Sequence, residues 1–317
     1  MSMEKFSFLV SEEEAGRPLK KVIRKKFHFS SRLMTKIKYQ DLITLNGKTV
    51  PGWAEARVGD QVSISLPEEV SGFPPEDIPI RVLYEDEDLL FIDKQAGVTV
   101  HPTHGHPDHT IANGLMKYMA DTGQSFKIRF VNRLDMDTSG VLVCAKNSHA
   151  QAELNKQMAA NQTEKHYQAF LSGIIPGALP EEASWAVTFA GPDTFTVKAP
   201  IGLPGDGFIG RAVVPIEDGG QESITIGKVL ERFPAADACL VELSLLTGRT
   251  HQIRVHMSYF GHPLLGDALY GGPTDRIARQ ALHACSFSCL HPVTGAPLSV
   301  SSPLPDDLQR LLEELRH

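Results

Sequence analysis

The chain has 317 residues, of which 42% are hydrophobic and 22% charged, and its formal net charge is -7. This is the composition of an ordinary soluble globular protein with room for one large and one small domain. No stretch approaches the roughly 18 apolar residues of a membrane span, and the start MSMEKFSFLV lacks the layout of a secretory signal. We therefore expect a cytoplasmic monomer without membrane contact. The cysteines, Cys144, Cys239, Cys285 and Cys289, are irregularly spaced, so we expect reduced thiols.

The net negative charge conceals a basic segment near the N-terminus, between residues 17 and 38, that contains no acidic residue. Its bases are Arg17, Lys20, Lys21, Arg24, Lys25, Lys26, Arg32, Lys36 and Lys38. A solvated charged helix is one interpretation, and a surface for nucleic-acid phosphates is the other. The absence of interspersed glutamates removes the ion pairs that would stabilise a merely solvated helix, so the pattern favours nucleic acid.

This basic segment belongs to a predicted small domain. Leu19, Val22, Ile23 and Phe27 recur at helical spacing, and the serines at 30 and 31 are typical caps for a second helix around 33–39. The Asn-Gly pair at 46–47 predicts a tight turn between extended runs, and the Gly-Asp pair at 59–60 opens another strand. Residues 12–66 resemble the alpha-L RNA-binding motif of small-subunit ribosomal protein S-four, with Arg17-Pro18-Leu19 in place of its usual Arg-Leu-Asp start. We predict an RNA-binding domain at 1–68 and a Pro- and Glu-rich linker at 69–80.

The remaining residues, 81–317, predict a larger domain with strands and helices in irregular order. Strand-like runs are DLLFIDK (88–94), GVLVCAK (140–146), HYQAFLSG (166–173) and CLVELSLL (239–246). Helical patterns are TIANGLMKYMADTG (110–123), SHAQAELNKQMAAN (148–161) and THQIRVHMSYF (250–260), the last stopped by a glycine. Because strands and helices do not alternate regularly, we predict the α+β class, with a mainly antiparallel mixed sheet flanked by helices and loops.

The segment VNRLDMDTSG (131–140) concentrates chemically active side chains. Asp137-Thr138-Ser139-Gly140 resembles the catalytic turn of aspartic proteases, and Asp121-Thr122-Gly123 offers a second copy. Those enzymes bring two carboxylates together from two lobes, and no lobe fits in the short stretch between these copies. The second copy is better explained as a helix C-terminus with a glycine cap.

A different resemblance covers residues 82–296. Five segments in order are similar to the RluA/RluD family of RNA pseudouridine synthases: DLLFIDKQAGVTVHP, NRLDMDTSG, EKHYQAFLSG, LLTGRTHQIRVHMSYFGHPLLGDALYGG and LHACSFSCLHPVTG. The resemblance implies an isomerase that cleaves the bond between ribose and uracil in RNA, turns the base and rejoins it through carbon 5. No cofactor is required for this reaction. Ribosomal RNA of the large subunit is the expected substrate, and transfer RNA is the alternative.

The same resemblance assigns Asp135 as the catalytic carboxylate near the anomeric carbon. Attack on that carbon and a glycal-type intermediate both remain open. An aspartate that only bonds turn backbone is the structural alternative, but Asp137, Thr138 and Ser139 are better placed for that task. Tyr167 is the second candidate; it could be a plain core tyrosine, or a ring that stacks on the extruded base and reaches its carbon 5 proton.

Arginines complete the predicted site. Arg254 shares a helix face with His251 and Ser258, and a guanidinium aimed at Asp135 would hold that carboxylate ionised. Arg249 fits phosphate contact, and the resemblance implies that Arg133 fills the gap left by the flipped nucleotide. Asn132 departs from the family, which usually has a histidine before that arginine.

Two possible metal sites are weak. His101, His104, His106 and His109 lie among turn formers, without a cysteine or carboxylate partner. In the segment 283–291, alternation places His283, Cys285, Phe287 and Cys289 on one strand face, which is more often a buried edge than a chelate. We therefore predict an RNA pseudouridine synthase without metal. A catalytically silent RNA-binding protein of the same fold is the alternative, and the intact Asp135, Tyr167 and Arg254 argue against it.

Overall fold

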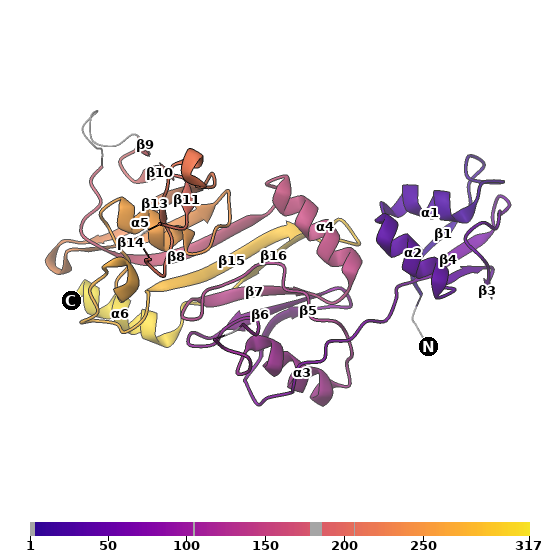
Figure 1. Cartoon of the computed structure of the whole chain (residues 1–317), viewed down its shortest axis with the longest axis horizontal. Helices are drawn as coiled ribbons and strands as arrows, with labels where there is room; N and C mark the ends of the chain where they lie inside the picture. Colours follow the sequence, from indigo (N-terminus) through magenta and orange to yellow (C-terminus); the bar gives the residue numbers. More distant parts are fainter. Residues whose placement is uncertain (1–3, 104, 178–185, 206) are drawn as a thin grey trace.

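The computed structural model describes residues 4–103, 105–177, 186–205 and 207–317. A small N-terminal body is followed by a larger one built on a long sheet (Figure 1). The small body contains β1 (Glu4–Leu9), α1 (Leu19–Phe27), α2 (Ser31–Tyr39), β2 (Ile43–Leu45), β3 (Lys48–Thr49) and β4 (Gln61–Ser65). Its strands form an antiparallel sheet in the order β1-β4-β2-β3.

The local signals of the small body work as predicted. The Ser30 side chain accepts a hydrogen bond from the Leu33 amide at 3.2 Å and so caps α2. Asn46 and Gly47 both have positive φ, 50° and 78°, as a two-residue hairpin turn requires. The helices and the sheet enclose a separate apolar core. The sequence analysis missed β1, which pairs with β4 along its length.

The large body contains the remaining elements. They are β5 (Arg81–Glu85), β6 (Leu89–Lys94), α3 (Ile111–Thr122), β7 (Ser139–Ala145), α4 (Ser148–Ala159), β8 (Glu164–Ser172), β9 (Val187–Gly191), β10 (Thr194–Lys198), β11 (Ile201–Gly202), β12 (Ala212–Val213), η1 (Ile216–Asp218), β13 (Ile224–Phe233), η2 (Pro234–Ala236), β14 (Ala238–Leu245), α5 (Gln252–Tyr259), η3 (Ala268–Tyr270), β15 (Leu282–Leu290), β16 (Pro297–Ser301) and α6 (Asp306–Arg316). The α+β prediction is confirmed.

The main sheet has the order β5-β6-β7-β15-β8-β14-β13-β10-β9, with β16 on the free part of β15. Within the described residues, β7 and β15 form its one parallel pair, and the other pairs are antiparallel. The strands β6 and β7 are buried on both faces, which explains their uninterrupted apolar sequences. The chain segment that leads into β7 therefore enters the sheet between β6 and β15.

Helices cover both faces of this sheet. α3 and α5 contribute Leu115 and Met257 to the main core, which also holds alternate residues of β6, β7 and β8. α4 packs its Ala150 and Leu154 against the opposite face of β6 and β7. α6 covers a further core near β8 and β14, at the end of the large body that is farthest from the small one (Figure 1). None of the described helices combines the length and the apolar composition needed to cross a bilayer.

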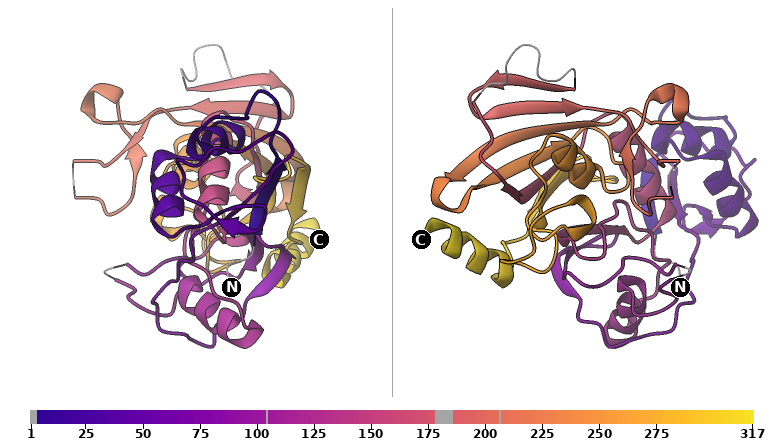
Figure 2. Two further views of the ribbon diagram at one scale, coloured as in Figure 1. Left: turned by 90° about the vertical axis from the view of Figure 1, so that its right-hand side faces the viewer. Right: turned by 60° about the vertical axis from the view of Figure 1, so that its left-hand side comes forward.

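The small body docks beside α4 of the large body (Figure 2). His149 of α4 meets the rings of Phe6 and Phe29 edge to face, at centroid distances of 5.2 and 5.1 Å. Lys5 pairs with Asp88 at 3.1 Å on the same side. These contacts join two bodies with separate cores. The domain boundaries 1–68, 69–80 and 81–317 stay a prediction.

Candidate active site

The segment that carries Asp135 forms a turn directly before β7. The Thr138 amide donates to the Asp135 carbonyl at 3.1 Å and closes the turn. Gly140 then brings the chain into the sheet with a φ of 110°, and a Cβ at this position would lie 2.2 Å from the Ala284 carbonyl oxygen. Only glycine fits this combination of backbone conformation and close approach. The turn is therefore held at its exit by the pairing of β7 with β15.

The turn rests on a buried lysine. Lys94, at the end of β6, donates from Nζ to the carbonyls of Met136, Thr138 and Gln95 at 2.7, 2.9 and 2.9 Å. Burial lowers the pKa of Lys94 to about 7, against the opposing effect of Asp137 and Asp135. Its side chain is fully enclosed. Lys94 thus links the end of β6 to the backbone on both sides of Asp137.

For Thr138 and Ser139, the expectation that their own side chains hold the turn is wrong. Ser139 Oγ contacts His283 Nδ1 at 3.0 Å, and Thr138 Oγ1 accepts from Gln280 Nε2 at 3.4 Å, so both side chains bond outside the turn. The Asp137 carbonyl accepts from an arginine, Arg279, at 2.9 Å. Long-range cations hold the turn because its carbonyls point away from solvent and need donors.

Asp135 meets Arg254 across the site. Arg254 Nη1 lies 3.3 Å from Asp135 Oδ2, and the same guanidinium donates to both oxygens of Asp267 at 2.7 and 2.8 Å. Burial lowers the pKa of Arg254, but Asp267 and Asp135 outweigh it and the net shift is upward. Tyr270 adds its ring face, with the guanidinium carbon 4.9 Å from the ring centroid. Arg254 is therefore a fixed cation beside a half-buried carboxylate.

Asp267 is a site residue that the sequence analysis missed. It lies directly before η3 and its side chain is 1% exposed. A buried carboxylate needs a charged partner, and Arg254 supplies it in bidentate geometry. The sequence feature that could have indicated Asp267 is an acidic residue after glycine in the block LLGDALYGG, which lies close in the chain to Arg254.

The side chains predicted to share a helix face converge on Tyr270, although α5 begins at Gln252 and His251 is its N-cap residue, with a φ of 58°. His251, Arg254 and Ser258 all contact Tyr270: His251 Nδ1 lies 2.8 Å from its hydroxyl, and Ser258 Oγ donates to its carbonyl at 2.8 Å. His251 Nε2 is 3.9 Å from Asp135 Oδ2. Burial lowers the pKa of His251, although Asp135 opposes this shift. The imidazole is therefore neutral near pH 7 and adds no second cation to the site.

Tyr167 reaches the same place from the centre of the sheet. It lies on β8 and is 7% exposed. Burial and the charge of Asp135 raise the pKa of Tyr167. A cavity of about 810 Å³ is lined by Tyr167, Asp135 and Arg254, and also by Arg133 and Arg249. The structure thus brings together residues from three separate sequence segments in one cavity.

The residues predicted to contact RNA do not all lie at the Asp135 cavity. Arg133 is exposed at the junction of the Asp135 cavity with two neighbouring cavities. Arg249 donates from Nε to the Glu222 carbonyl at 3.3 Å. The N-terminal bases lie on the small body, outside the Asp135 cavity. Two of them have acidic partners within the chain: Lys26 pairs with Glu14 and Lys36 with Glu69, each at 2.7 Å.

Asn132 has a structural contact. Its Nδ2 donates to the Val141 carbonyl at 3.1 Å, and its Oδ1 accepts from the Val143 amide at 2.8 Å. The amide thus bridges two residues of β7, and it supplies one donor and one acceptor where a histidine would supply two ring nitrogens.

Two of the possible metal ligands in the histidine cluster contact neighbouring side chains. His109 pairs with Glu76, His101 packs on Phe73, and His104 lies outside the described residues. A different group, Asp86, Asp88 and His291, has ligand atoms within 4.8 Å of one another. Those atoms are already bonded: Tyr84 donates to Asp86 at 2.6 Å, and Lys5 and Asn147 contact Asp88 at 3.1 and 2.7 Å. This network ties the β5–β6 turn to neighbouring elements.

Comparisons with known proteins agree with this geometry. The family described as RNA pseudouridylate synthase matches residues 88–259. The chain is 38% identical to the ribosomal large subunit pseudouridine synthase D of Xanthomonas campestris, over 97% of this chain and 92% of that protein. It is also 38% identical to an uncharacterized RNA pseudouridine synthase, YjbO, of Bacillus subtilis, over 91% of this chain and 96% of that one.

A solved structure shares the fold. Human RNA pseudouridylate synthase domain containing 1 is 26% identical, with a TM-score of 0.55 over 77% of this chain and 98% of that one. The family match spans Asp135, Tyr167 and Arg254, which meet in one cavity. The RluA/RluD-family prediction is therefore confirmed: the chain belongs to the RNA pseudouridylate synthases, isomerases that act on uridine in RNA.

Proposed function

We propose that this enzyme modifies uridines of large-subunit ribosomal RNA, with Asp135 as the catalytic carboxylate and Tyr167 and Arg254 as its partners. The contact of 3.3 Å between Asp135 and Arg254, inside a cavity that also contains Tyr167, is the observation that carries the assignment. An ionised carboxylate is needed at the anomeric carbon, and a fixed guanidinium beside it favours that charge state.

The reaction breaks the bond from ribose carbon 1′ to uracil nitrogen 1 and forms a bond from carbon 1′ to carbon 5. Asp135 acts at the sugar, either by bonding to carbon 1′ or by removing a neighbouring proton to give a glycal. The detached uracil turns within the cavity, and carbon 5 then bonds to carbon 1′. The proton of carbon 5 leaves to solvent and nitrogen 1 gains one, so atoms and charge balance without a cofactor.

Tyr167 acts after Asp135 in this proposal. Burial and the negative Asp135 raise the pKa of Tyr167, so the phenol is protonated in the resting enzyme. A neutral phenol is a poor base, but it can stack on uracil and donate a hydrogen bond. When Asp135 bonds to the sugar its charge disappears, which removes one of the causes of the raised pKa. Tyr167 can then pass its hydroxyl proton to water, and the resulting phenolate accepts the carbon 5 proton, so that one proton in total is released to solvent.

The exposed arginines contact the RNA chain. Arg133 lies at the cavity mouth, where it can take the place of the flipped nucleotide and compensate for lost stacking. Arg249, which also lines this cavity, suits a phosphate. The exposed bases of α1, including Lys20, Lys21 and Arg24, extend the positive surface across the small body. Relatives named for the ribosomal large subunit, together with this basic domain, favour ribosomal over transfer RNA.

Release of the carbon 5 hydrogen tests the proposal directly. Transcripts of large-subunit ribosomal RNA and of transfer RNA, carrying tritium at uridine carbon 5, are incubated with the enzyme and with Asp135→Asn. We expect tritium in water only with the unaltered enzyme and the ribosomal transcript, while the variant still binds that RNA. Release from transfer RNA alone would overturn the substrate assignment. Binding without release from any transcript would favour the silent RNA-binding alternative.

A further inference from the structure

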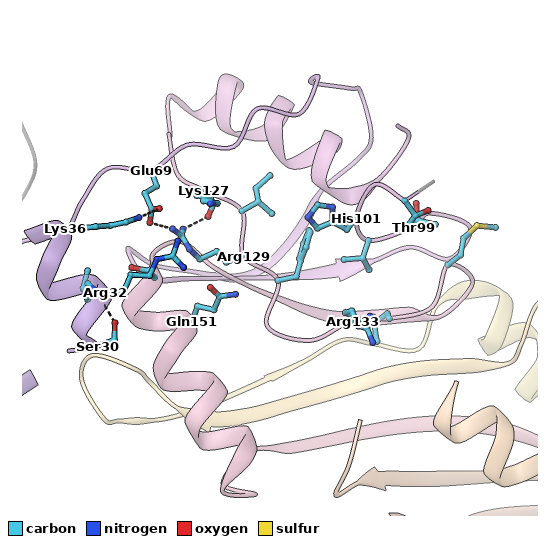
Figure 3. A pocket seen from close by; sticks show the side chains of 18 residues that line it. Ser30, Arg32, Lys36, Glu69, Thr99, His101, Lys127, Arg129, Arg133 and Gln151 are labelled. Atoms are coloured by element: carbon cyan, nitrogen blue, oxygen red, sulfur yellow. Dashed lines mark hydrogen bonds and ion pairs between the residues drawn. The ribbon is translucent and has the colours of Figure 1, made fainter. Parts of the chain in front are cut away.

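A second cavity of about 700 Å³ opens between the small body and the large one (Figure 3). Its walls come from α2, from the segment between the bodies, from the stretches 99–103 and 127–136 of the large body, and from α4. Its charged lining residues are Arg32, Lys36, Lys127, Arg129, Arg133 and Glu69. The excess of cations over a single carboxylate makes this inter-domain groove attractive to a polyanion.

Glu69 is placed between cations of the two bodies. Lys36 of α2 contacts its Oε1 at 2.7 Å, and Arg129 of the large body pairs with its Oε2 (Figure 3). Arg129 is buried, so it depends on this carboxylate as its acidic partner. Two cations that converge on the oxygens of one anion form the geometry in which arginine and lysine also hold a phosphate.

The groove is continuous with the active site. Phe130, Arg133 and Leu134 line both this groove and the Asp135 cavity. Arg133 is exposed at the junction, next but one to Asp135 in the chain. An RNA strand whose uridine lies at Asp135 therefore has a path past Arg133 into the groove.

Aromatic rings stand along this path. His101 is exposed and meets Phe130 edge to face at 6.1 Å and Phe73 at 5.1 Å. Unpaired bases stack on such rings without regard to sequence. Cations for the phosphates and rings for the bases together are typical of a surface for single-stranded nucleic acid, whereas a protein partner would need a larger apolar patch.

We propose that the inter-domain groove binds the single-stranded RNA next to the target uridine, and that Glu69 occupies, in the free enzyme, the position of an RNA phosphate between Lys36 and Arg129. This inference rests on the proposed function and deepens it. On binding, the phosphate replaces the carboxylate, so the two bodies stay bridged by the same cations. Glu69 thereby weakens binding of arbitrary RNA, because every ligand must first displace it.

A matched pair of carboxylate variants tests whether an RNA phosphate replaces the Glu69 carboxylate. Glu69→Gln and Glu68→Gln remove the same charge one residue apart, but Glu68 is exposed at the surface. Binding of fluorescein-labelled oligouridylate of twelve nucleotides is measured by anisotropy. We expect Glu69→Gln to bind about three- to ten-fold more tightly, and Glu68→Gln to bind as the unaltered enzyme does. Equal affinities of the two variants would show that Glu69 does not compete with RNA.

Replacing the cations of the groove should change the affinity for RNA in the opposite direction. Lys36→Gln and Arg129→Gln should weaken oligouridylate binding and reduce its salt dependence by about 0.7 in the log-log slope per lost phosphate contact. Lys48→Gln, on the exposed hairpin of the same body, serves as control. With 4-thiouridine in the RNA, we expect photo-crosslinks in residues 99–103 or 127–136. An unchanged slope, or crosslinks confined to α1, would overturn the groove assignment.

Tritium release separates this proposal from the function on which it rests. In Lys36→Gln and Arg129→Gln, we expect a raised KM for the ribosomal transcript and an unchanged kcat, whereas Glu69→Gln should lower KM. If the unaltered enzyme releases tritium but all groove variants keep its KM, the groove proposal is wrong and the proposed function stands. If the unaltered enzyme releases none, the function fails, and the anisotropy results still decide whether the groove binds RNA.

Discussion

Asp267 and Asp135 share the guanidinium of Arg254, but unequally: Asp267 accepts two hydrogen bonds, at 2.7 and 2.8 Å, and Asp135 one, at 3.3 Å. The buried acid fixes the arginine, and the more exposed acid makes the longer contact. If Asp135 is the catalytic carboxylate, as we propose, Asp267 is a positioning residue, since it acts on Asp135 through Arg254.

Replacement of Asp267 should reveal this role. In Asp267→Asn we expect kcat for tritium release to fall about 10- to 100-fold, as for other supporting residues of this kind, while KM changes little. The melting temperature should also fall, because a buried cation loses its partner. Asp275→Asn is the control, as Asp275 is exposed and lies 4.0 Å from its arginine. Normal turnover in a folded Asp267→Asn would remove the positioning role.

Lys94 should give the stability of the enzyme a distinct pH dependence. Burial lowers the pKa of Lys94 from 10.5 to about 7. Between these values the unfolded chain binds the proton and the folded one does not, so the contribution of this group to stability rises as pH increases. The contribution of Lys94 should grow by a few kcal/mol from pH 6 to pH 9.

Urea unfolding of the unaltered enzyme and of Lys94→Met at pH 6, 7.5 and 9 measures this effect. The difference between their free energies of unfolding should increase with pH, because only the lysine titrates. The variant should be less stable overall, since the carbonyls of Met136 and Thr138 lose their donor. Lys48→Met, at an exposed site, controls for the change of charge. A pH-independent difference would mean that Lys94 keeps an ordinary pKa.

Gly140 should tolerate no side chain. In Gly140→Ala, the new Cβ would meet the Ala284 carbonyl oxygen at 2.2 Å, on a backbone with φ of 110°. We expect a loss of at least about 2 kcal/mol of stability, from strain and from displacement of β15. Thermal unfolding measures the loss, and Gly72→Ala, with open space around it, is the control. Equal melting temperatures for the two variants would contradict the close approach of β7 to β15.

Docking of the small body should weaken in acid. His149 packs between Phe6 and Phe29, and burial lowers the pKa of His149, with Glu153 and Asp88 opposing and Lys156 assisting. An undocked imidazole binds protons more readily, so docking loses stability as pH falls below about 6.5. We expect the radius of gyration to rise between pH 7.5 and pH 5.

The variant His149→Phe should abolish that rise, because phenylalanine does not titrate. His28→Asn, at an exposed position, should expand like the unaltered enzyme. Small-angle scattering distinguishes these outcomes, and equal expansion of His149→Phe and the unaltered enzyme would assign the transition to another group.

Local patterns predicted much of this fold. The helices of the small body, the turn at Asn46 and the buried runs of β6 and β7 were evident, because caps, turn residues and apolar periodicity act over a few residues. α6 was missed although Leu308, Leu311 and Leu315 have helical spacing and are buried. β1 was missed because its partner, β4, lies far along the chain.

The site residues also separate into those that a local segment indicates and those that depend on distant contacts. Asp135, Tyr167 and Arg254 were found because each lies in a recognisable segment, and the structure places them in one cavity. The support from Lys94 and Asp267 was not found, because it consists of contacts between distant parts of the chain. The same holds for Glu69, whose neighbours in sequence give no indication that it joins cations of two bodies.

The parallel pairing of β7 with β15 joins Ser139 to His283, which are 144 positions apart. Synthesis on the ribosome delivers the small body first, and its sheet is complete once β4 has emerged. The turn at Asp135 emerges much earlier than Arg254, Arg279 and β15, the partners that hold it. A nascent chain therefore carries the complete basic surface of the small body long before it carries the assembled Asp135 site, and under the proposed function it would be recruited to RNA before it is able to modify it.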